Sequence, residues 1–198
     1  AAEGGLAVAE ALVAAAGAGG DAGDVSKLVN AGDARVYNRH LDAYARRTPL
    51  CCAAESGFPD LVGVLLNAGA QIEAPSEEQR TALWLACRHS RLEVARQLLQ
   101  RGARADARDA QGVSVLEAAT VGCNEELVLA LLRHGIGDVN ATAGQPLREA
   151  VKAGRRAVVE ALLTHGAAAQ PACDGGEDAP LHAACEKGDE YLVALLVR

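Results

Sequence analysis

Segments of this chain repeat one another at a nearly constant spacing, and this repetition constrains the fold more than any other feature of the sequence. Their first residues are Thr48, Thr81, Ser114, Gln145 and Ala179. Successive starts lie 33, 33, 31 and 34 residues apart, and a weaker copy starts at Ala11, 37 residues before the first of these. A fixed period of this length is typical of architectures in which one short unit stacks on the next.

Each copy carries the signals of two short helices. Thr48-Pro49 opens the first helix in one copy, because a hydroxyl caps free backbone N–H groups and proline is tolerated in the first turn. A leucine anchor follows, then small residues that allow close helix packing, and then a helix-ending glycine such as Gly57. The leucine anchors are Leu50, Leu83, Leu116, Leu147 and Leu181.

The second helix of each copy is predicted from a single apolar stripe. Apolar residues recur at i, i+1, i+4 and i+5, a spacing that places them on one helix face. One such set is Leu127, Val128, Leu131 and Leu132. Glycines end these helices, and the polar residues that follow favour a turn or hairpin. These glycines are Gly69, Gly102, Gly135 and Gly166.

These residues resemble the ankyrin repeat family. The resemblance rests on TPL at Thr48, TAL at Thr81, APLHAA at Ala179 and the recurring LL-x-x-G-A, and it covers nearly all of residues 11–198. It implies an all-α solenoid of stacked helix-turn-helix units joined by hairpin loops. We expect a single ankyrin-repeat domain over residues 1–198, with six repeats of which the first is degenerate and the last is cut short.

The chain also departs from the family pattern. The usual histidine of TPLH survives only as His182, and its place is taken elsewhere by Cys51, Trp84, Glu117 and Arg148. Ser90 and Cys123 stand where a glycine is expected, with Gly122 one residue early. We expect local adjustment at these positions and an unchanged fold.

Composition and motifs limit the compartment and the partners expected for the domain. The six cysteines form no CxxC and no secretory signal is present, which predicts reduced thiols in the cytoplasm or the nucleus. No apolar run approaches the length of a membrane span. The net charge of -7 argues against nucleic acid as a partner. The chain lacks an initiator Met and stops within a repeat, so we expect a fragment of a longer protein.

No catalytic residues are predicted. The sequence has no G-x-S-x-G, no phosphate-binding G-x-x-x-x-G-K-[ST] and no H-E-x-x-H. The glycine-rich residues 17–23 lack the lysine of a nucleotide loop, and the repeat register makes them a turn. His134 and His165 precede helix-ending glycines, where capping explains them better than metal binding. We therefore expect no enzyme activity, no cofactor and no metal.

One connection is longer than the others and chemically distinct. The four extra residues between the first two repeats fall in RVYNRHLDAYARR, residues 35–47, which is basic and contains two of the three tyrosines. Tyrosine and arginine are enriched at interface hot spots. The stretch is interpreted either as an enlarged finger that binds a partner or as a solvated loop with a tyrosine folded back. Its candidate contacts are Tyr37, His40, Tyr44, Arg46 and Arg47.

A second cluster is predicted from family geometry. The resemblance places Arg80, Trp84, Arg88 and His89 on the concave side of the third repeat, next to Arg47 and Glu55 of the second. A tryptophan flanked by arginines can hold an extended peptide while the guanidinium groups bind carboxylates. The alternative interpretation is that Trp84 fills space between repeats.

The leading functional hypothesis is a non-catalytic module that binds an acidic protein or peptide segment through its concave face and hairpin fingers. The alternative is a regulatory or oligomerisation domain of a larger signalling enzyme, such as a kinase, GTPase or ubiquitin ligase, which contacts its own chain. Both terminal helical segments are apolar, and isolated stacks need polar terminal repeats. The sequence therefore also predicts self-association or contact with further chain.

Overall fold

The computed structural model describes residues 30, 34–38, 43–122, 124–134, 139–140, 145–169 and 179–197, with the backbone alone for 34–38, 43–46 and 145. The expected first repeat, near Ala11, and residue His40 lie outside these residues. Helices and one β-hairpin make up the described part. The elements are β1 (Ala34–Asn38), β2 (Ala43–Arg47), α3 (Pro49–Ser56), α4 (Pro59–Asn67), α5 (Ala82–Arg88), α6 (Leu92–Gln100), α7 (Val115–Gly122), α8 (Glu125–Arg133), α9 (Gln145–Lys152), α10 (Arg156–Thr164), α11 (Pro180–Glu186) and α12 (Glu190–Leu196).

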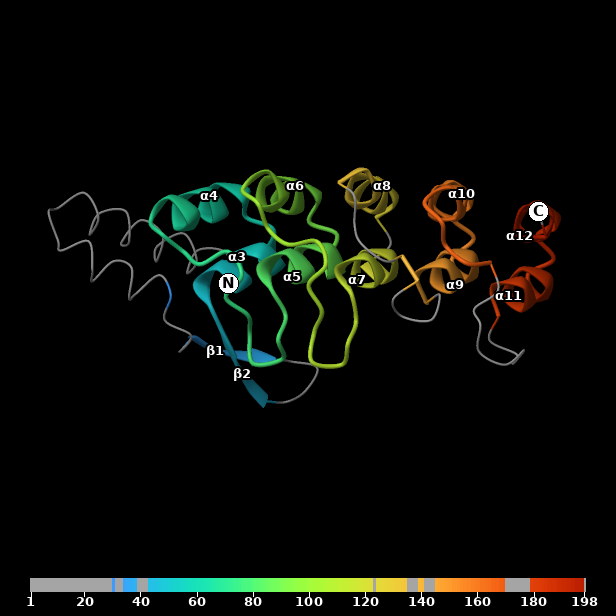
Figure 1. The fold of residues 1–198 in the computed structure, drawn as a ribbon. Helices are drawn as coiled ribbons and strands as arrows, with labels where there is room; N and C mark the ends of the chain where they lie inside the picture. The colour runs from blue at the N-terminus through green and yellow to red at the C-terminus, as the bar shows by residue number, and fades with distance from the viewer. Residues whose placement is uncertain are drawn as a thin grey trace, which may run out of the picture.

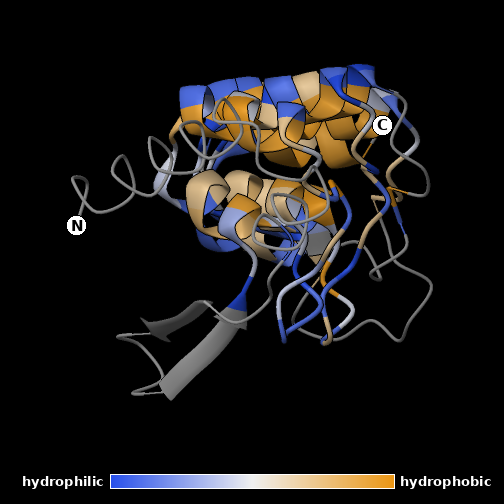
Figure 2. Cartoon of the chain, turned by 90° about the vertical axis from the view of Figure 1, so that its left-hand side faces the viewer, coloured by the Kyte–Doolittle hydropathy of each residue, from blue (hydrophilic) through white to orange (hydrophobic). Residues whose placement is uncertain are grey.

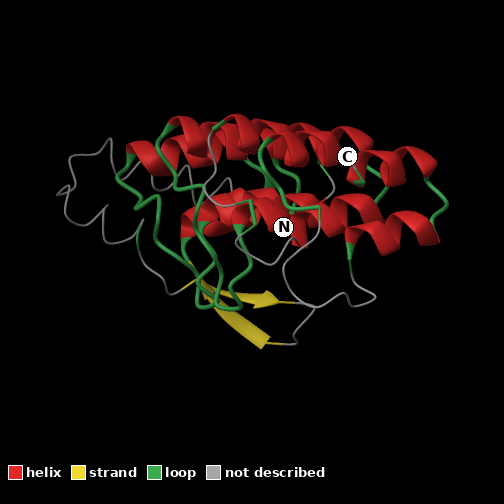
Figure 3. Ribbon diagram, turned by 45° about the vertical axis from the view of Figure 1, so that its right-hand side comes forward, coloured by secondary structure: helices red, strands yellow, loops and turns green. Residues whose placement is uncertain are grey.

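The helices form two parallel layers, as an ankyrin solenoid requires. The first helices of successive repeats, α3, α5, α7, α9 and α11, pack side by side in one layer. The second helices, α4, α6, α8, α10 and α12, form the other layer (Figure 1). We call these the first-helix layer and the second-helix layer. The connecting loops extend beyond the first-helix layer on its far side, and the β-hairpin extends on the same side (Figure 3).

The core lies between the layers, and residues coloured as hydrophobic are frequent on the sides of the two layers that face each other (Figure 2). Four of the five leucine anchors are at most 2% exposed, while Leu181 is only partly buried. The difference follows from position, because α11 has a first-helix neighbour on one side only within the described residues. The stripe of α8 is confirmed, since its four apolar residues are all buried.

Helix starts follow the predicted capping chemistry. The side chains of Thr48 and Thr81 accept hydrogen bonds from the backbone N–H groups of Cys51 and Trp84 at the starts of α3 and α5. Ala179 holds the same extended backbone at the start of α11 but offers no side-chain cap. The Thr-Pro opening is therefore a working cap in the repeat of Thr48 and is absent from the repeat of Ala179.

The expected local adjustment occurs at Ser90. This residue takes the left-handed conformation, with φ 57°, that glycine holds at Gly57, Gly154 and Gly188. Its hydroxyl donates a hydrogen bond to the carbonyl of Gly122 in the next repeat. A Cβ atom on Gly122 would lie 2.5 Å from the Cys87 carbonyl oxygen, so glycine allows the ends of α5 and α7 to approach.

The long connection forms the predicted hairpin. Strands β1 and β2 pair antiparallel, with Tyr37 opposite Tyr44 and Arg35 opposite Arg46. The last residue of β2, Arg47, directly precedes the cap of α3. The hairpin is therefore joined to the first-helix layer without an intervening linker.

Candidate functional site

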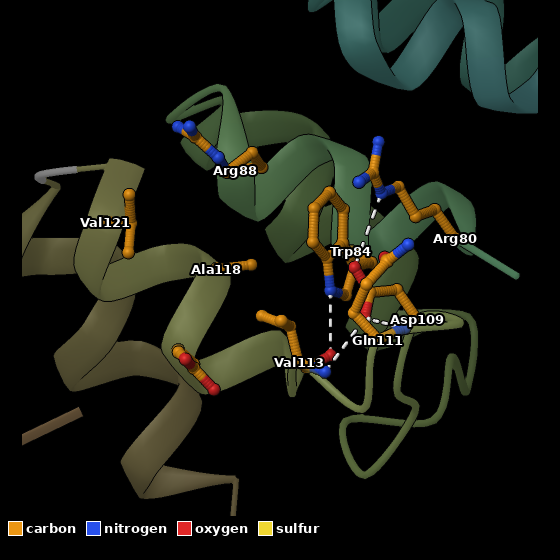
Figure 4. A pocket seen from close by; sticks show the side chains of 9 residues that line it. Arg80, Trp84, Arg88, Asp109, Gln111, Val113, Ala118 and Val121 are labelled. Atoms are coloured by element: carbon orange, nitrogen blue, oxygen red, sulfur yellow. Dashed lines mark hydrogen bonds and ion pairs between the residues drawn. The ribbon is translucent and has the colours of Figure 1, made fainter. Parts of the chain in front are cut away.

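A groove lies where the first-helix layer meets the loop that connects α6 to α7. It has a volume of about 320 Å³ and is lined by α5, by α7 and by the loop (Figure 4). Its lining residues are Arg80, Trp84, Arg88, Asp109, Gln111, Val113, Glu117, Ala118 and Val121. Three of the residues predicted from sequence, Arg80, Trp84 and Arg88, are thus brought together here.

Trp84 forms the wall of the groove and is 5% exposed. Its indole N–H donates a hydrogen bond of 3.0 Å to the carbonyl of Val113, which belongs to the loop of the next repeat (Figure 4). Burial and this bond favour the interpretation in which Trp84 fills space between repeats. Little of the ring therefore remains accessible to a ligand.

Arg80 lies over the indole and is held from two other sides. Its guanidinium carbon is 4.6 Å from the centre of the Trp84 ring, a cation–π arrangement. It forms ion pairs with Glu78 and, at 3.5 Å, with Asp109. The other oxygen of the buried Asp109 accepts backbone N–H bonds from Gln111 and Val113. Arg80 therefore helps to hold the loop between α6 and α7 in place through its ion pair with Asp109.

Glu55 of α3 connects the hairpin to α5. Its carboxylate pairs with Arg47 and, at 3.4 Å, with His89, and its backbone carbonyl accepts a 3.0 Å hydrogen bond from Arg91. Arg47 is 6% exposed, so its position gives it a structural role instead of the exposed contact expected from sequence.

The pKa of His89 is lowered from its ordinary value of 6.5, first by partial burial and then by neighbouring guanidinium groups. Glu55 would act in the opposite direction, but it is shared with Arg47, which already compensates its charge. The guanidinium groups belong, in decreasing order of effect, to Arg88, Arg91, Arg47 and Arg80. His89 is therefore neutral near pH 7, and the positive charge of this region comes from arginine.

Arg88 differs from the other basic residues of the site. It is exposed at the last turn of α5 and lines the groove opposite Val121, which is 41% exposed (Figure 4). Within the described residues its side chain makes neither an ion pair nor a hydrogen bond. It is thus the basic group of the groove whose charge the described protein leaves uncompensated.

Sequence reasoning found the basic and aromatic residues of the site and missed Asp109, Val113 and Val121. Asp109 could have been found from sequence, because an Asp shortly before a glycine such as Gly112 is typical of a turn in which the Asp side chain accepts backbone hydrogen bonds. Val121 could have been found from repeat register, since it occupies the position of Arg88 one repeat later. The backbone of Tyr37, Tyr44 and Arg46 lies in the hairpin strands, and their contact with a partner stays a prediction.

Cys51, Cys52, Cys87 and Cys185 are free, and burial raises the pKa of the first three. The described residues contain no cluster of histidine, cysteine and carboxylate side chains suited to a metal ion. Among the described helices, none has the length and apolarity needed to cross a bilayer.

Comparison with known proteins gives one consistent result. A sequence model of ankyrin repeats in three copies matches residues 11–109 and 115–198. The B-cell lymphoma 3 protein homolog of Mus musculus is 34% identical over 174 residues, which is 83% of this chain and 38% of that protein. Neurogenic locus notch homolog protein 2 of Homo sapiens is 30% identical over 72% of this chain and 6% of its own length.

A further relative is the ankyrin repeat and KH domain-containing protein mask-1 of Caenorhabditis elegans, which is 35% identical over 48% of this chain and 4% of its own length. The chain thus spans well under half the length of each of these relatives. The family match covers most of the chain and agrees with the two helix layers described above. The chain belongs to the ankyrin repeat family.

Proposed function

We propose that this chain is a non-catalytic module that binds an acidic segment of a partner protein across the first-helix layer and its loops. Ankyrin repeats mediate protein–protein interaction, and this gives the general class. The observation that carries the specific proposal is the groove between α5 and α7, with the uncompensated Arg88 at its rim.

The distribution of charge supports an acidic partner. The chain carries a net charge of -7, yet the exposed end of α5 and the start of α6 present Arg88 and Arg91 beside the largely neutral His89. Three carboxylates of this region, on Glu55, Glu78 and Asp109, are paired with arginines of the protein itself, and Glu117 in the groove also interacts within the protein. A partner carboxylate would therefore meet the uncompensated charge of Arg88 at this place.

The structure also refines the residues proposed for contact. Arg88 and His89 are exposed and available for direct contact, and Glu55 is partly exposed. The buried residues of the site would contribute indirectly, by holding the contact residues in place. Arg47 would hold the hairpin against α3, and Arg80 and Trp84 would hold the loop between α6 and α7 against α5. Tyr37, His40, Tyr44 and Arg46 remain candidate contacts from the hairpin. The free thiols support a reducing compartment, the cytoplasm or the nucleus.

A matched pair of double variants tests the proposal. The site variant carries Arg88→Glu and Val121→Ser, and the control carries Arg133→Glu and Val197→Ser, which make the same chemical changes away from the groove. Circular dichroism first establishes equal folding. In affinity capture from cell lysate, we expect a partner that the wild-type chain and the control retain and the site variant loses. Equal recovery by all three chains would contradict the proposal.

A second candidate function is contact with a further part of the same protein or with a second copy. It is favoured by an apolar groove of about 600 Å³ between α10 and α12, bordered by Tyr191, which is 45% exposed. Sedimentation equilibrium of wild type and Tyr191→Ser tests this function. Concentration-dependent association that weakens in the variant would support it, and a monomer in both would count against self-association.

A further inference from the structure

We propose that the groove between α5 and α7 recognises a two-part element of the partner: an apolar side chain that enters the groove, and a nearby carboxylate that pairs with Arg88. This inference rests on the proposed function and names its ligand chemistry. It also makes Arg88 the residue that determines specificity.

The apolar part follows from the lining of the groove. Val121 and the half-buried Val113 supply accessible carbon surface, while Ala118 and Trp84 line the groove but are almost fully buried. Val121 is among the exposed large apolar residues of the described chain. The polar groups at one end are already bonded to each other, since Asp109 is held by Arg80 and by backbone N–H groups. Entry of an apolar side chain therefore buries carbon surface without breaking these bonds.

The acidic part follows from which charges are compensated. Glu117 also lines the groove, but it is engaged within the protein, as are Asp109 and the neighbouring Arg80. Arg88 has no such partner among the described residues, so its guanidinium group is free to bind a planar carboxylate through two hydrogen bonds. A basic side chain at the same place would meet the uncompensated charge of Arg88 and would be repelled.

The spacing of the two parts follows from the repeat. Arg88 and Val121 occupy equivalent positions on adjacent first helices, whose axes pack roughly 8–10 Å apart. An extended peptide advances about 3.3 Å per residue, so crossing from one helix to the next takes about three residues. We therefore expect the carboxylate and the apolar side chain to be about three residues apart in the partner.

A random peptide library displayed on phage tests the inference with the full chain as bait. Selection on wild type should enrich an acidic residue and an apolar residue at a fixed spacing. Selection on Arg88→Glu should lose the acidic preference and keep the apolar one, whereas selection on Val121→Ser should weaken the apolar preference and keep the acidic one. Arg133→Glu is the matched control, because Arg133 is also exposed in the last turn of a helix and has no side-chain partner among the described residues.

One enriched peptide is then synthesised and titrated by fluorescence anisotropy. We expect its Kd to rise by roughly tenfold or more with Arg88→Glu and by less than about twofold with Arg133→Glu. An acidic preference that persists with Arg88→Glu, or enriched peptides without acidic residues, would overturn the inference and leave the proposed function intact. Enriched peptides whose binding is unchanged by both groove variants would overturn the inference and the proposed site together.

Discussion

Trp84 illustrates how one residue can serve structure and site together. Its indole N–H joins α5 to the loop of the next repeat, and its ring face carries Arg80. In family members the same position usually holds a histidine, so this chain replaces a small ring with a larger one. The hydrogen bond between the indole and Val113 sets the distance between α5 and the loop, and both residues line the groove.

Replacing Trp84 with phenylalanine removes the donor and keeps an aromatic ring. We expect Trp84→Phe to lower the free energy of unfolding by about 1–2 kcal/mol, because the carbonyl of Val113 keeps the bond from the Asp109 N–H but loses the one from the indole, and a small void opens. Urea denaturation measures this. The control Tyr191→Phe removes an exposed hydrogen bond to Glu160 and should change stability by less than about 0.5 kcal/mol. Equal stability of Trp84→Phe and wild type would show that the bond to Val113 contributes nothing.

His89 gives a prediction for pH. Its pKa is lowered in the folded state, so the unfolded chain binds the proton more readily, and the free energy of unfolding decreases as pH falls below about 6.5. The effect is small, because the side chain is 42% exposed. NMR titration of the imidazole should give a pKa below 6.5, and Arg88→Gln should raise it by removing a repelling charge. Arg133→Gln should leave it unchanged; a wild-type pKa above 6.5 would contradict the assignment.

At the level of the element, the repeats differ in how well their first helices are capped. Ala179 has the extended backbone of a cap residue and precedes Pro180, as Thr48 precedes Pro49, but it lacks the hydroxyl. The start of α11 therefore leaves a backbone N–H without the bond that α3 has. This is a local deficiency that a single substitution can correct.

We expect Ala179→Thr to raise the free energy of unfolding by about 0.5–1 kcal/mol, because the new hydroxyl accepts a hydrogen bond from the first turn of α11. Thr48→Ala should lower it by about 1 kcal/mol for the opposite reason. Thermal unfolding followed by circular dichroism compares both with wild type. A decrease in Tm with Ala179→Thr would mean that the side chain clashes instead of capping.

The sequence predicted the elements better than it predicted the contacts of the site. Helix starts, leucine anchors and the hairpin depend on neighbours within a few residues, and these signals are local. The burial of Arg47 depends on Glu55, and the role of Arg80 depends on Asp109, 29 residues away in the next loop. The Arg80–Asp109 pair forms only when repeats stack, and the Arg47–Glu55 pair only when the hairpin meets α3, so exposed and buried arginines look the same in the sequence.

At the scale of the whole molecule, the described repeats form a linear array in which each packs mainly against its neighbours (Figure 1). Stability in such arrays is close to a sum of repeat terms and nearest-neighbour interfaces. The core between the layers is continuous, yet a defect in one repeat acts mainly on the adjoining ones.

Leu147 in α9 tests this behaviour, because it is 1% exposed. We expect Leu147→Ala to cost about 2–5 kcal/mol and to reduce amide hydrogen-exchange protection in α9–α12 more than in α3–α6. Leu50→Ala, the equivalent change in α3, should show the reverse gradient. Uniform loss of protection along the chain in both variants would instead indicate a single cooperative unit.

The groove between α5 and α7 has a consequence for how such a protein can change over generations. Trp84 and Arg88 come from one repeat, while Val113 and Val121 come from the next. Duplication or deletion of a whole unit would therefore divide this site, joining half of it to a new neighbour. Recombination at repeat boundaries would therefore change the binding preference of the site. No point mutation in the residues that line the groove would be needed.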